Sequence, residues 1–205
     1  MTPSDPTQRL RLYLIRHGEV EGAAEGRVFG QTDVPLSKRG LQQSRLLADR
    51  LASTHLRAVY SSDLKRASQA AEMIASRHGL NLQRDAAWRE INMGLWDGRS
   101  IADLHTEAAV EVEKLFSDPM SFTYPDGESF SSFAARVQTT LDQLLRVHPH
   151  GEVAVVTHGG VCRTIIGGAL EIPMRNWLRL TQDYGSLNVI DWYGANPVLR
   201  QINAI

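Results

Sequence analysis

Two apolar segments of the chain end in the same way, on a histidine followed by glycine. Residues 12–18 read LYLIRHG, and residues 154–160 read AVVTHGG. Because parallel strands bring their carboxyl ends to one edge of a sheet, we expect His17 and His158 to lie close together there. The neighbouring glycines allow close approach of a ligand. Histidines in such a position can act as a nucleophile or as metal ligands.

Two arginines favour one of these chemistries. Arg16 directly precedes His17, and Arg66 follows the segment SSDLK in the first turn or so of a predicted helix. A helix N-terminus favours anions, and a guanidinium can bind two phosphate oxygens at once. Zinc would lack its usual ligands, because the sequence has no HExxH motif and only one cysteine. We therefore predict a phosphate site without a metal. We expect no part in it for the other five histidines, which are His55, His78, His105, His148 and His150.

The elements that must position these residues alternate between strands and helices. Short apolar runs predict strands at residues 10–15, 57–62, 80–84, 152–158, 186–194 and 197–202. Helical spacing predicts helices after a cap at Ser37, after a cap at Ser62 or Asp63, and over 100–117, 128–147 and 161–170. This order indicates an α/β fold of three layers, with a doubly wound, mostly parallel sheet and flanking helices. Residues from about 92 to 128 are predicted to form a small inserted helical lobe.

Length and composition limit the class of protein. A chain of 205 residues suits one domain, which we place at residues 10–205 after a flexible tail of residues 1–9. The net charge of -1 indicates no general affinity for nucleic acid or anionic membrane. No apolar run approaches the roughly 20 residues of a transmembrane helix, and the start MTPSDPTQR does not resemble a signal peptide. The single Cys162 excludes an intrachain disulfide and suits a reducing compartment. We therefore expect a cytoplasmic protein.

Six motifs in this order resemble those of the histidine phosphatase superfamily, in the branch shared with cofactor-dependent phosphoglycerate mutase. They are LIRHGE, GRVFGQTDVPLSKRG, SSDLKRASQA, EINMGLWDG, DGESF with a following arginine, and VTHGGVCR. The matches run from residue 12 to about residue 165, which is most of the chain. The resemblance implies a phosphoglycerate mutase-like fold and phosphoryl-transfer chemistry without a cofactor.

The resemblance also implies roles for individual residues. His17 would attack phosphorus and become phosphohistidine, while Glu90 would donate a proton to the leaving group and later act as the base. The residues that would bind the phosphoryl group or substrate are Arg16, Arg66, His158, Gly159 and Gln31. Since an imidazole attacks only through an unprotonated nitrogen, we expect the other ring N–H of His17 to be held by an acceptor such as a backbone carbonyl. One departure is Ala23, which stands where the family often has asparagine.

The same motifs favour hydrolysis over phosphate transfer between metabolites. EINMGLWDG resembles the phosphatase form rather than the ERHYG-type segment of the mutases, and GRVFGQTDVPLS resembles α-ribazole phosphatases and broad-specificity relatives. We expect a metal-independent phosphomonoester hydrolase that acts on a small phosphorylated metabolite, in a chain compatible with a homodimer. The alternatives are a mutase-type phosphoryl transferase, a phosphoprotein phosphatase and a non-catalytic phosphate-binding member. Four aromatic residues of the lobe are candidates for substrate contacts, namely Trp96, Phe116, Phe122 and Tyr124.

Overall fold

A single six-stranded sheet forms the centre of the molecule. The computed structural model describes residues 9–205, so the expected tail lies outside the described residues except for Arg9, which already belongs to the first strand. The strand order is β3-β2-β4-β1-β5-β6. The strands are β1 (Arg9–Arg16), β2 (Leu56–Ser61), β3 (Leu82–Arg84), β4 (Gly151–Thr157), β5 (Leu187–Tyr193) and β6 (Asn196–Ala204).

The sheet is mostly parallel, as the sequence predicts, with an antiparallel edge. β1 pairs in parallel with β4, and β2 pairs in parallel with both β4 and β3. β5 is antiparallel to β1 and to β6. A short turn rather than a crossover helix joins β5 and β6, which accounts for their antiparallel pairing. The register places Arg16 opposite Thr157, so β1 and β4 end at the same level.

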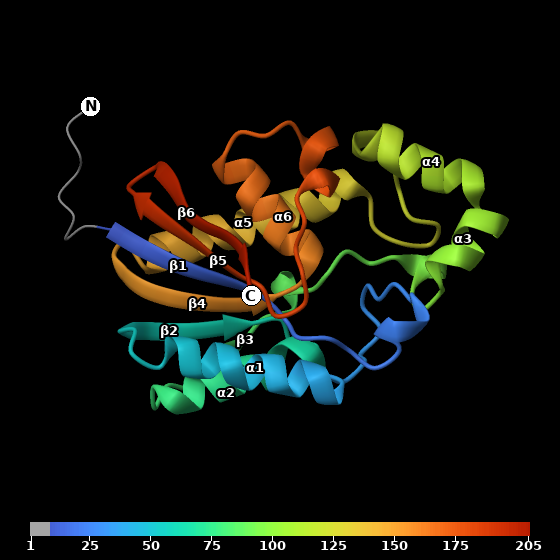
Figure 1. Ribbon diagram of the computed structural model, residues 1–205. Helices are drawn as coiled ribbons and strands as arrows, with labels where there is room; N and C mark the ends of the chain where they lie inside the picture. The colour runs from blue at the N-terminus through green and yellow to red at the C-terminus, as the bar shows by residue number, and fades with distance from the viewer. Residues whose placement is uncertain (1–8) are drawn as a thin grey trace.

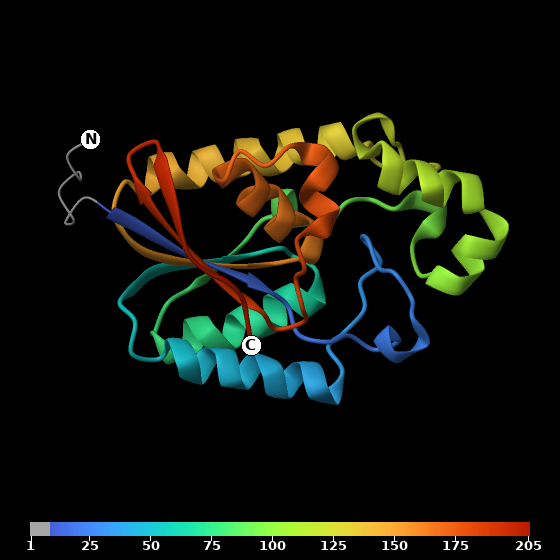
Figure 2. The same ribbon diagram turned by 45° about the horizontal axis from the view of Figure 1, so that its top comes forward.

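Helices cover both faces of the sheet and give the predicted three layers. Figure 2 shows α1 and α2 below the sheet, and α5 and α6 above it. The helices are α1 (Lys38–Leu51), α2 (Lys65–Arg77), α3 (Ile101–Glu107), α4 (Ala109–Ser117), α5 (Phe130–Val147) and α6 (Gly159–Ala169). Short 3-10 turns lie at Ala23–Glu25, Ala86–Trp88, Gly94–Trp96, Pro119–Ser121 and Met174–Arg179. Among residues 9–205 no helix is both long and apolar enough to cross a bilayer.

The two cores follow from the alternation of side chains along the central strands. Leu12 and Leu14 of β1 pack into the cluster under α5 and α6, whereas Tyr13 and Ile15 pack into the cluster with α1 and α2. Neighbouring β4 alternates in the same way. Because both faces are buried, these strands read as continuous apolar runs. Such strands make a rigid support for residues attached to their ends.

The segment predicted as an inserted lobe lies beyond one end of the sheet. Figure 1 shows α3 and α4 at the right of the molecule, on the side toward which β1 runs. The sequence predicts one helix over residues 100–117, but the helix breaks at Ala108, whose φ and ψ are -136° and 39°. The break lets both short helices bury apolar residues in the same core, with Leu104 from α3 and Leu115 from α4.

The predicted cap of α2 is also wrong. The helix begins after Leu64, and neither Ser62 nor Asp63 caps its first turn; the Asp63 carboxylate instead accepts two hydrogen bonds from Arg89, at 2.7 and 2.6 Å. The backbone amide of Lys65, at the start of the helix, donates to the side chain of Asp33, which lies in a loop distant in the sequence, at 2.7 Å. A cap supplied by another segment leaves no local sequence signal. The Ser37 cap of α1 is confirmed, since its side chain accepts from the amide of Gly40.

Candidate active site

The two histidines predicted to meet do so at the carboxyl edge of the sheet. His17 follows β1 directly, and His158 follows β4 as the N-cap of α6. Their ring centroids are 5.1 Å apart, with an interplanar angle of 67°. The backbone amide of His17 donates to the carbonyl of Thr157 at 2.9 Å, which continues the ladder between the two strands. Both side chains are buried, at 4% and 1% exposure.

Hydrogen bonds at the Nδ1 atoms assign different tautomers to the two rings. Nδ1 of His17 lies 2.7 Å from the carbonyl oxygen of Gly18, which can only accept, so Nδ1 carries the proton and Nε2 has a free lone pair. This confirms the expected backbone acceptor. Nδ1 of His158 instead accepts from Nε of Arg66 at 3.3 Å. A neutral His158 therefore carries its proton on Nε2.

Both imidazoles are held in the neutral form. Burial lowers the pKa of His17 well below its usual value of 6.5, and the charges of Arg66 and Arg16 lower it further. Burial likewise lowers the pKa of His158, together with Arg66, His17 and Arg16. At neutral pH the site thus contains one unprotonated nitrogen that can attack and one N–H that can donate.

Arg66 is a fully buried guanidinium held by three neighbours. Besides the bond to His158, its Nη1 donates to Thr32 O at 2.7 Å and its Nη2 to Gly30 O at 2.5 Å. The side chain has 0% exposure. Each Nη atom has a second N–H, so the guanidinium is oriented and can still bind an anion. Its origin in the first turn of α2 is as predicted.

Arg16 approaches the site from the end of β1. Its guanidinium carbon lies 3.9 Å from the centroid of the Tyr184 ring, and Nη1 donates to the carbonyl of Gln182. The Tyr184 ring centroid is itself 5.6 Å from that of His17. Tyr184 therefore orients Arg16 by a cation–π contact next to the candidate nucleophile.

The arrangement leaves buried donors for an anion. Among residues 9–205, no carboxylate lies within ion-pair distance of Arg16, Arg66 or Arg163. In the same part of the chain, Nε of Arg16 and Nε2 of His158 are buried without a hydrogen-bond partner. Buried charges are normally paired, and unsatisfied buried donors cost free energy. A bound phosphoryl group would satisfy both requirements.

Glu90 is positioned by two backbone amides. Its Oε1 accepts from Ile91 N at 2.9 Å, and its Oε2 accepts from Gly160 N at the start of α6, at 2.8 Å. The side chain is 8% exposed. Glycine at position 160 permits this contact, because a Cβ there would lie 2.1 Å from Oε1 of Glu90. The contact brings Glu90 to the helix that His158 caps.

The remaining predicted residues also lie here, although Gln31 is already engaged. Its side-chain amide donates to the carbonyl of Glu90 at 3.2 Å. Gly159 lies between two guanidiniums: the position of its missing Cβ is 3.2 Å from Nη1 of Arg163 and 3.4 Å from Nε of Arg16. Ala23 lies in a 3-10 turn of the loop after β1 and offers no polar side chain.

The backbone of the segment that carries Glu90 is also held by side chains. Arg136 of α5 donates to the carbonyls of Ala87 and Arg89 at 2.8 and 3.0 Å, and forms an ion pair with Glu128 at 2.9 Å. The carboxylate of Glu128 in turn accepts from Asn92 N at 3.2 Å. The DGESF motif and its following arginine thus fasten the segment that carries Glu90.

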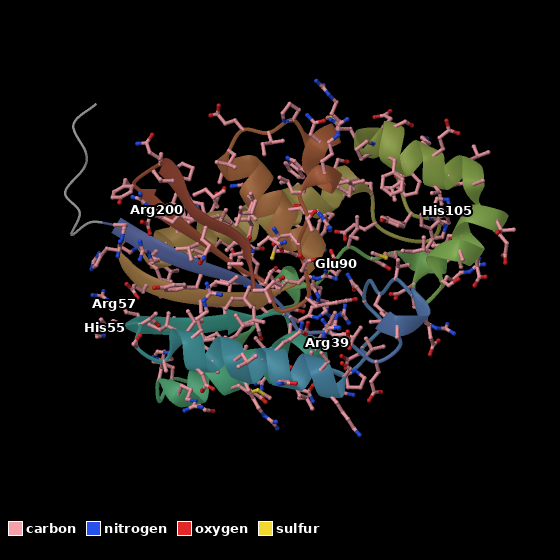
Figure 3. All side chains as sticks on the ribbon, in the orientation of Figure 1. Arg39, His55, Arg57, Glu90, His105 and Arg200 are labelled. Atoms are coloured by element: carbon pink, nitrogen blue, oxygen red, sulfur yellow. The ribbon has the colours of Figure 1, made fainter. Side chains whose placement is uncertain are left out.

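The structure does not bring the other histidines to the site. Figure 3 shows Glu90 near the middle of the molecule, His55 at the opposite end of the sheet and His105 on α3. His148 bonds to the hydroxyl of Tyr60 at 2.8 Å, at the far end of α5. Within residues 9–205 no three His, Cys, Asp or Glu side chains are grouped as metal ligands would be.

The lobe aromatics divide into packing residues and one exposed ring. Trp96, Phe122 and Tyr124 are buried against one another, with centroid distances of 5.0 to 5.5 Å. Phe116 is 62% exposed. Phe116, Trp96 and Tyr124 help to line an apolar cavity of about 140 Å³. Burial raises the pKa of Tyr124, and the charge of Glu90 raises it further.

Sequence reasoning missed three residues that help to form the site. Arg163 and Asp97 belong to the motifs VTHGGVCR and EINMGLWDG, so the sequence carries a signal for them, but their residue types alone do not indicate a role. Nε of Arg163 donates to Leu180 O at 2.8 Å, which leaves its Nη groups beside Gly159. Tyr184 lies in an irregular segment before β5 and carries no motif.

Comparisons with known proteins agree with this geometry. A model described as the histidine phosphatase superfamily (branch 1) matches residues 12–205. A Proteus mirabilis protein named "Probable phosphoglycerate mutase GpmB" is 32% identical over 183 residues, covering 89% of this chain and 85% of that protein.

Two solved structures are similar over almost the whole chain. The α-ribazole phosphatase of Shigella flexneri has a TM-score of 0.86 at 28% identity, and the match covers 95% of this chain and 96% of that one. The mycobacterial glucosyl-3-phosphoglycerate phosphatase has a TM-score of 0.87 at 27% identity, covering 96% and 100%. The latter enzyme has also been solved with VO3 and with inorganic phosphate.

Proposed function

The chain belongs to branch 1 of the histidine phosphatase superfamily, and from that premise we propose that it hydrolyses phosphomonoesters through a phosphohistidine at His17. The observation that carries the proposal is the pair of opposite tautomers. His17 has a free lone pair at Nε2, while His158 has an N–H at Nε2. Both lie among guanidiniums that have no carboxylate partner within residues 9–205.

In the first step, Nε2 of His17 attacks phosphorus and the bond from phosphorus to the ester oxygen breaks. Arg16, Arg66 and His158 donate to the phosphoryl oxygens and stabilise the charge that spreads over them. The departing alkoxide takes a proton from Glu90. The products of this step are a free alcohol, phosphohistidine and a Glu90 carboxylate.

In the second step, the Glu90 carboxylate takes a proton from water, and the water oxygen attacks phosphorus. The phosphorus–nitrogen bond breaks and returns its electron pair to Nε2 of His17. Inorganic phosphate leaves, and both residues regain their initial protonation states. The same carboxyl group thus acts first as acid and then as base.

Hydrolysis is favoured over a mutase reaction by the segment after Glu90. The chain has EINMGLWDG from Glu90 onward, which resembles the phosphatase form of this segment. The match with this chain covers 96% of the α-ribazole phosphatase structure and 100% of the glucosyl-3-phosphoglycerate phosphatase structure. The names of these two enzymes indicate α-ribazole phosphate and glucosyl-3-phosphoglycerate as their substrates, which supports a small phosphorylated metabolite as the substrate class. We propose a cytoplasmic setting from the single buried cysteine.

A phosphoglycerate mutase-type transfer is the second candidate, because the sequence relative from Proteus mirabilis carries that name. A mutase would need to keep its phosphoenzyme from water and pass the phosphoryl group to a second alcohol. The two functions therefore differ in the fate of the phosphoryl group and not in how His17 takes it up.

The test is release of inorganic phosphate from a panel of phosphomonoesters in excess EDTA, with His17→Ala alongside. The panel contains p-nitrophenyl phosphate, 3-phosphoglycerate, phosphoserine, sugar phosphates and α-ribazole 5′-phosphate. We expect release that survives EDTA and is lost in His17→Ala. Isomerisation of 3-phosphoglycerate without net release would support the mutase. Retention of more than a few per cent of activity in His17→Ala would show that His17 is not the nucleophile.

Sedimentation of the same sample tests the predicted homodimer.

A further inference from the structure

Asp97 binds three successive backbone amides of the loop before α1. Its Oδ1 accepts from Gly30 N at 3.0 Å, and its Oδ2 accepts from Gln31 N at 2.7 Å and from Thr32 N at 2.9 Å. Hydrogen bonds to a carboxylate are stronger than those between neutral groups. Three of them to one short segment fix the orientation of its peptide planes.

The opposite side of the same loop holds Arg66. The carbonyls of Gly30 and Thr32 accept from its two Nη atoms, at 2.5 and 2.7 Å. In a planar trans peptide the C=O points away from the N–H of the next residue. The amide of Gln31 donates to Asp97, so the carbonyl of Gly30 must point away from Asp97 and toward Arg66.

This arrangement orients the Arg66 guanidinium without neutralising it by contact. No carboxylate within residues 9–205 lies within ion-pair distance of Arg66, and Asp97 reaches it only through the peptide groups of the loop. A direct ion pair would compete with phosphate for the same N–H groups. A carboxylate one peptide away keeps those groups available.

We propose that Asp97 is a positioning residue for the phosphate site, which acts on Arg66 through residues 30–32. The proposal rests on the proposed function, because it assigns Arg66 to the phosphoryl group. The loop also ties Gln31 to the backbone of Glu90, so Asp97 connects the anion-binding side of the site with the acid–base residue.

The test is a double-mutant cycle between Asp97→Asn and Arg66→Lys. Loss of a residue that orients a metal ligand typically costs about 10- to 100-fold, and we expect an effect of similar size for a residue that orients an anion-binding guanidinium. We expect such a loss in Asp97→Asn, both in affinity for vanadate, measured by calorimetry, and in kcat/KM for p-nitrophenyl phosphate. Lysine has no guanidinium for the loop to orient. In the Arg66→Lys background, Asp97→Asn should therefore lower vanadate affinity and kcat/KM by no more than about threefold, since the effects of coupled sites are not additive.

Asp85→Asn is the matched control. Asp85 also anchors a loop by accepting from a backbone amide, that of Ala87 at 2.8 Å, but it forms no hydrogen bond with residues 30–32. We expect its vanadate affinity to match that of the wild type. If Asp97→Asn does not fold, Asp97→Glu replaces it in the double-mutant cycle, because glutamate keeps the charge but lengthens the side chain.

The outcomes separate this proposal from the proposed function. Equal losses in both backgrounds, or no loss of vanadate affinity in Asp97→Asn, would overturn the role of Asp97 even if the wild type hydrolyses phosphomonoesters. Wild-type protein that binds vanadate but hydrolyses nothing would reject the proposed function, while the vanadate cycle would still decide the role of Asp97.

Discussion

Two histidines with the same side chain serve different purposes at this site because their Nδ1 atoms have different neighbours. A carbonyl at Gly18 makes Nδ1 of His17 a donor, and a guanidinium at Arg66 makes Nδ1 of His158 an acceptor. The attacking lone pair and the donor N–H are thereby set before any substrate binds. Such preorganisation avoids the cost of reorienting groups during the reaction.

The role of Glu90 can be tested through the leaving group. In Glu90→Gln the proton donor is lost, so hydrolysis of alkyl phosphates should fall by about 10²- to 10⁴-fold, the usual contribution of general acid–base catalysis. Release of p-nitrophenolate needs little proton donation, so formation of the phosphoenzyme from p-nitrophenyl phosphate should fall much less. Burst kinetics with the two ester types measure this difference. Equal losses in the burst on both substrates would indicate that Glu90 serves only to position other groups.

Residues with a motif could be assigned a role from the sequence, while those without one could not. Arg16, His17 and His158 adjoin strand ends whose apolar runs are visible in the sequence, so their convergence followed from topology. Tyr184 contacts Arg16 only because an irregular segment folds back beside β1, and nothing local in the sequence encodes that contact. Arg163 stands in a quoted motif, but its position beside Gly159 depends on how α6 packs.

At the scale of elements, α6 joins the acid–base residue to the phosphate site. Its cap is His158, and the amide of its second residue, Gly160, binds Glu90. In Gly160→Ala the new Cβ would lie 2.1 Å from Oε1 of Glu90, the mobile end of that side chain. We expect Glu90 to swing away while the fold persists. Activity on alkyl phosphates should fall as in Glu90→Gln, with little change in the urea midpoint.

Gly168→Ala in the same helix is the control for this prediction. Gly168 is exposed, and the nearest atom to its added Cβ would be Oε1 of Gln138, at 3.4 Å. Alanine in a helix is more stable than glycine by roughly 0.5–1 kcal/mol, so this variant should be fully active and no less stable. Full activity in Gly160→Ala would contradict the placement of Glu90 by α6.

Most elements were predictable because each carries its own periodic pattern, and the errors lie where another segment decides. The cap of α2 comes from Asp33, and the break at Ala108 lets α3 and α4 share one core. The antiparallel pairing of β5 and β6 follows from a short turn that the sequence alone left open. Local patterns do not contain such long-range contacts.

For the molecule as a whole, a site of buried cations and neutral histidines opposes stability in acid. The pKa values of His17 and His158 are lowered well below 6.5, so between pH 6.5 and those values the unfolded chain binds protons that the folded protein does not. Stability is therefore full above about pH 6.5 and falls as the pH drops below it. Each histidine contributes a loss of about 1.4 kcal/mol for every unit by which its pKa is lowered in the folded protein.

Urea unfolding between pH 7.5 and 5.5 measures this slope. We expect His17→Asn and His158→Asn each to flatten it, because each removes one of the two depressed groups. His148, whose pKa is lowered by burial and by Arg57, adds a slope of the same sign that both variants retain. A stability that stays constant or rises as the pH falls through this range would contradict the assignment of buried neutral imidazoles.

The most direct test of the account is to trap and locate the phosphoryl group on the enzyme. The wild type is mixed with radiolabelled p-nitrophenyl phosphate, quenched in alkali within milliseconds and digested, and the labelled histidine is identified by mass spectrometry. The isomer is then identified against phosphohistidine standards. Because Nδ1 of His17 is held by the carbonyl of Gly18, we predict label on His17 alone and on its Nε2. Label on another residue, on Nδ1, or no label during turnover would contradict the account.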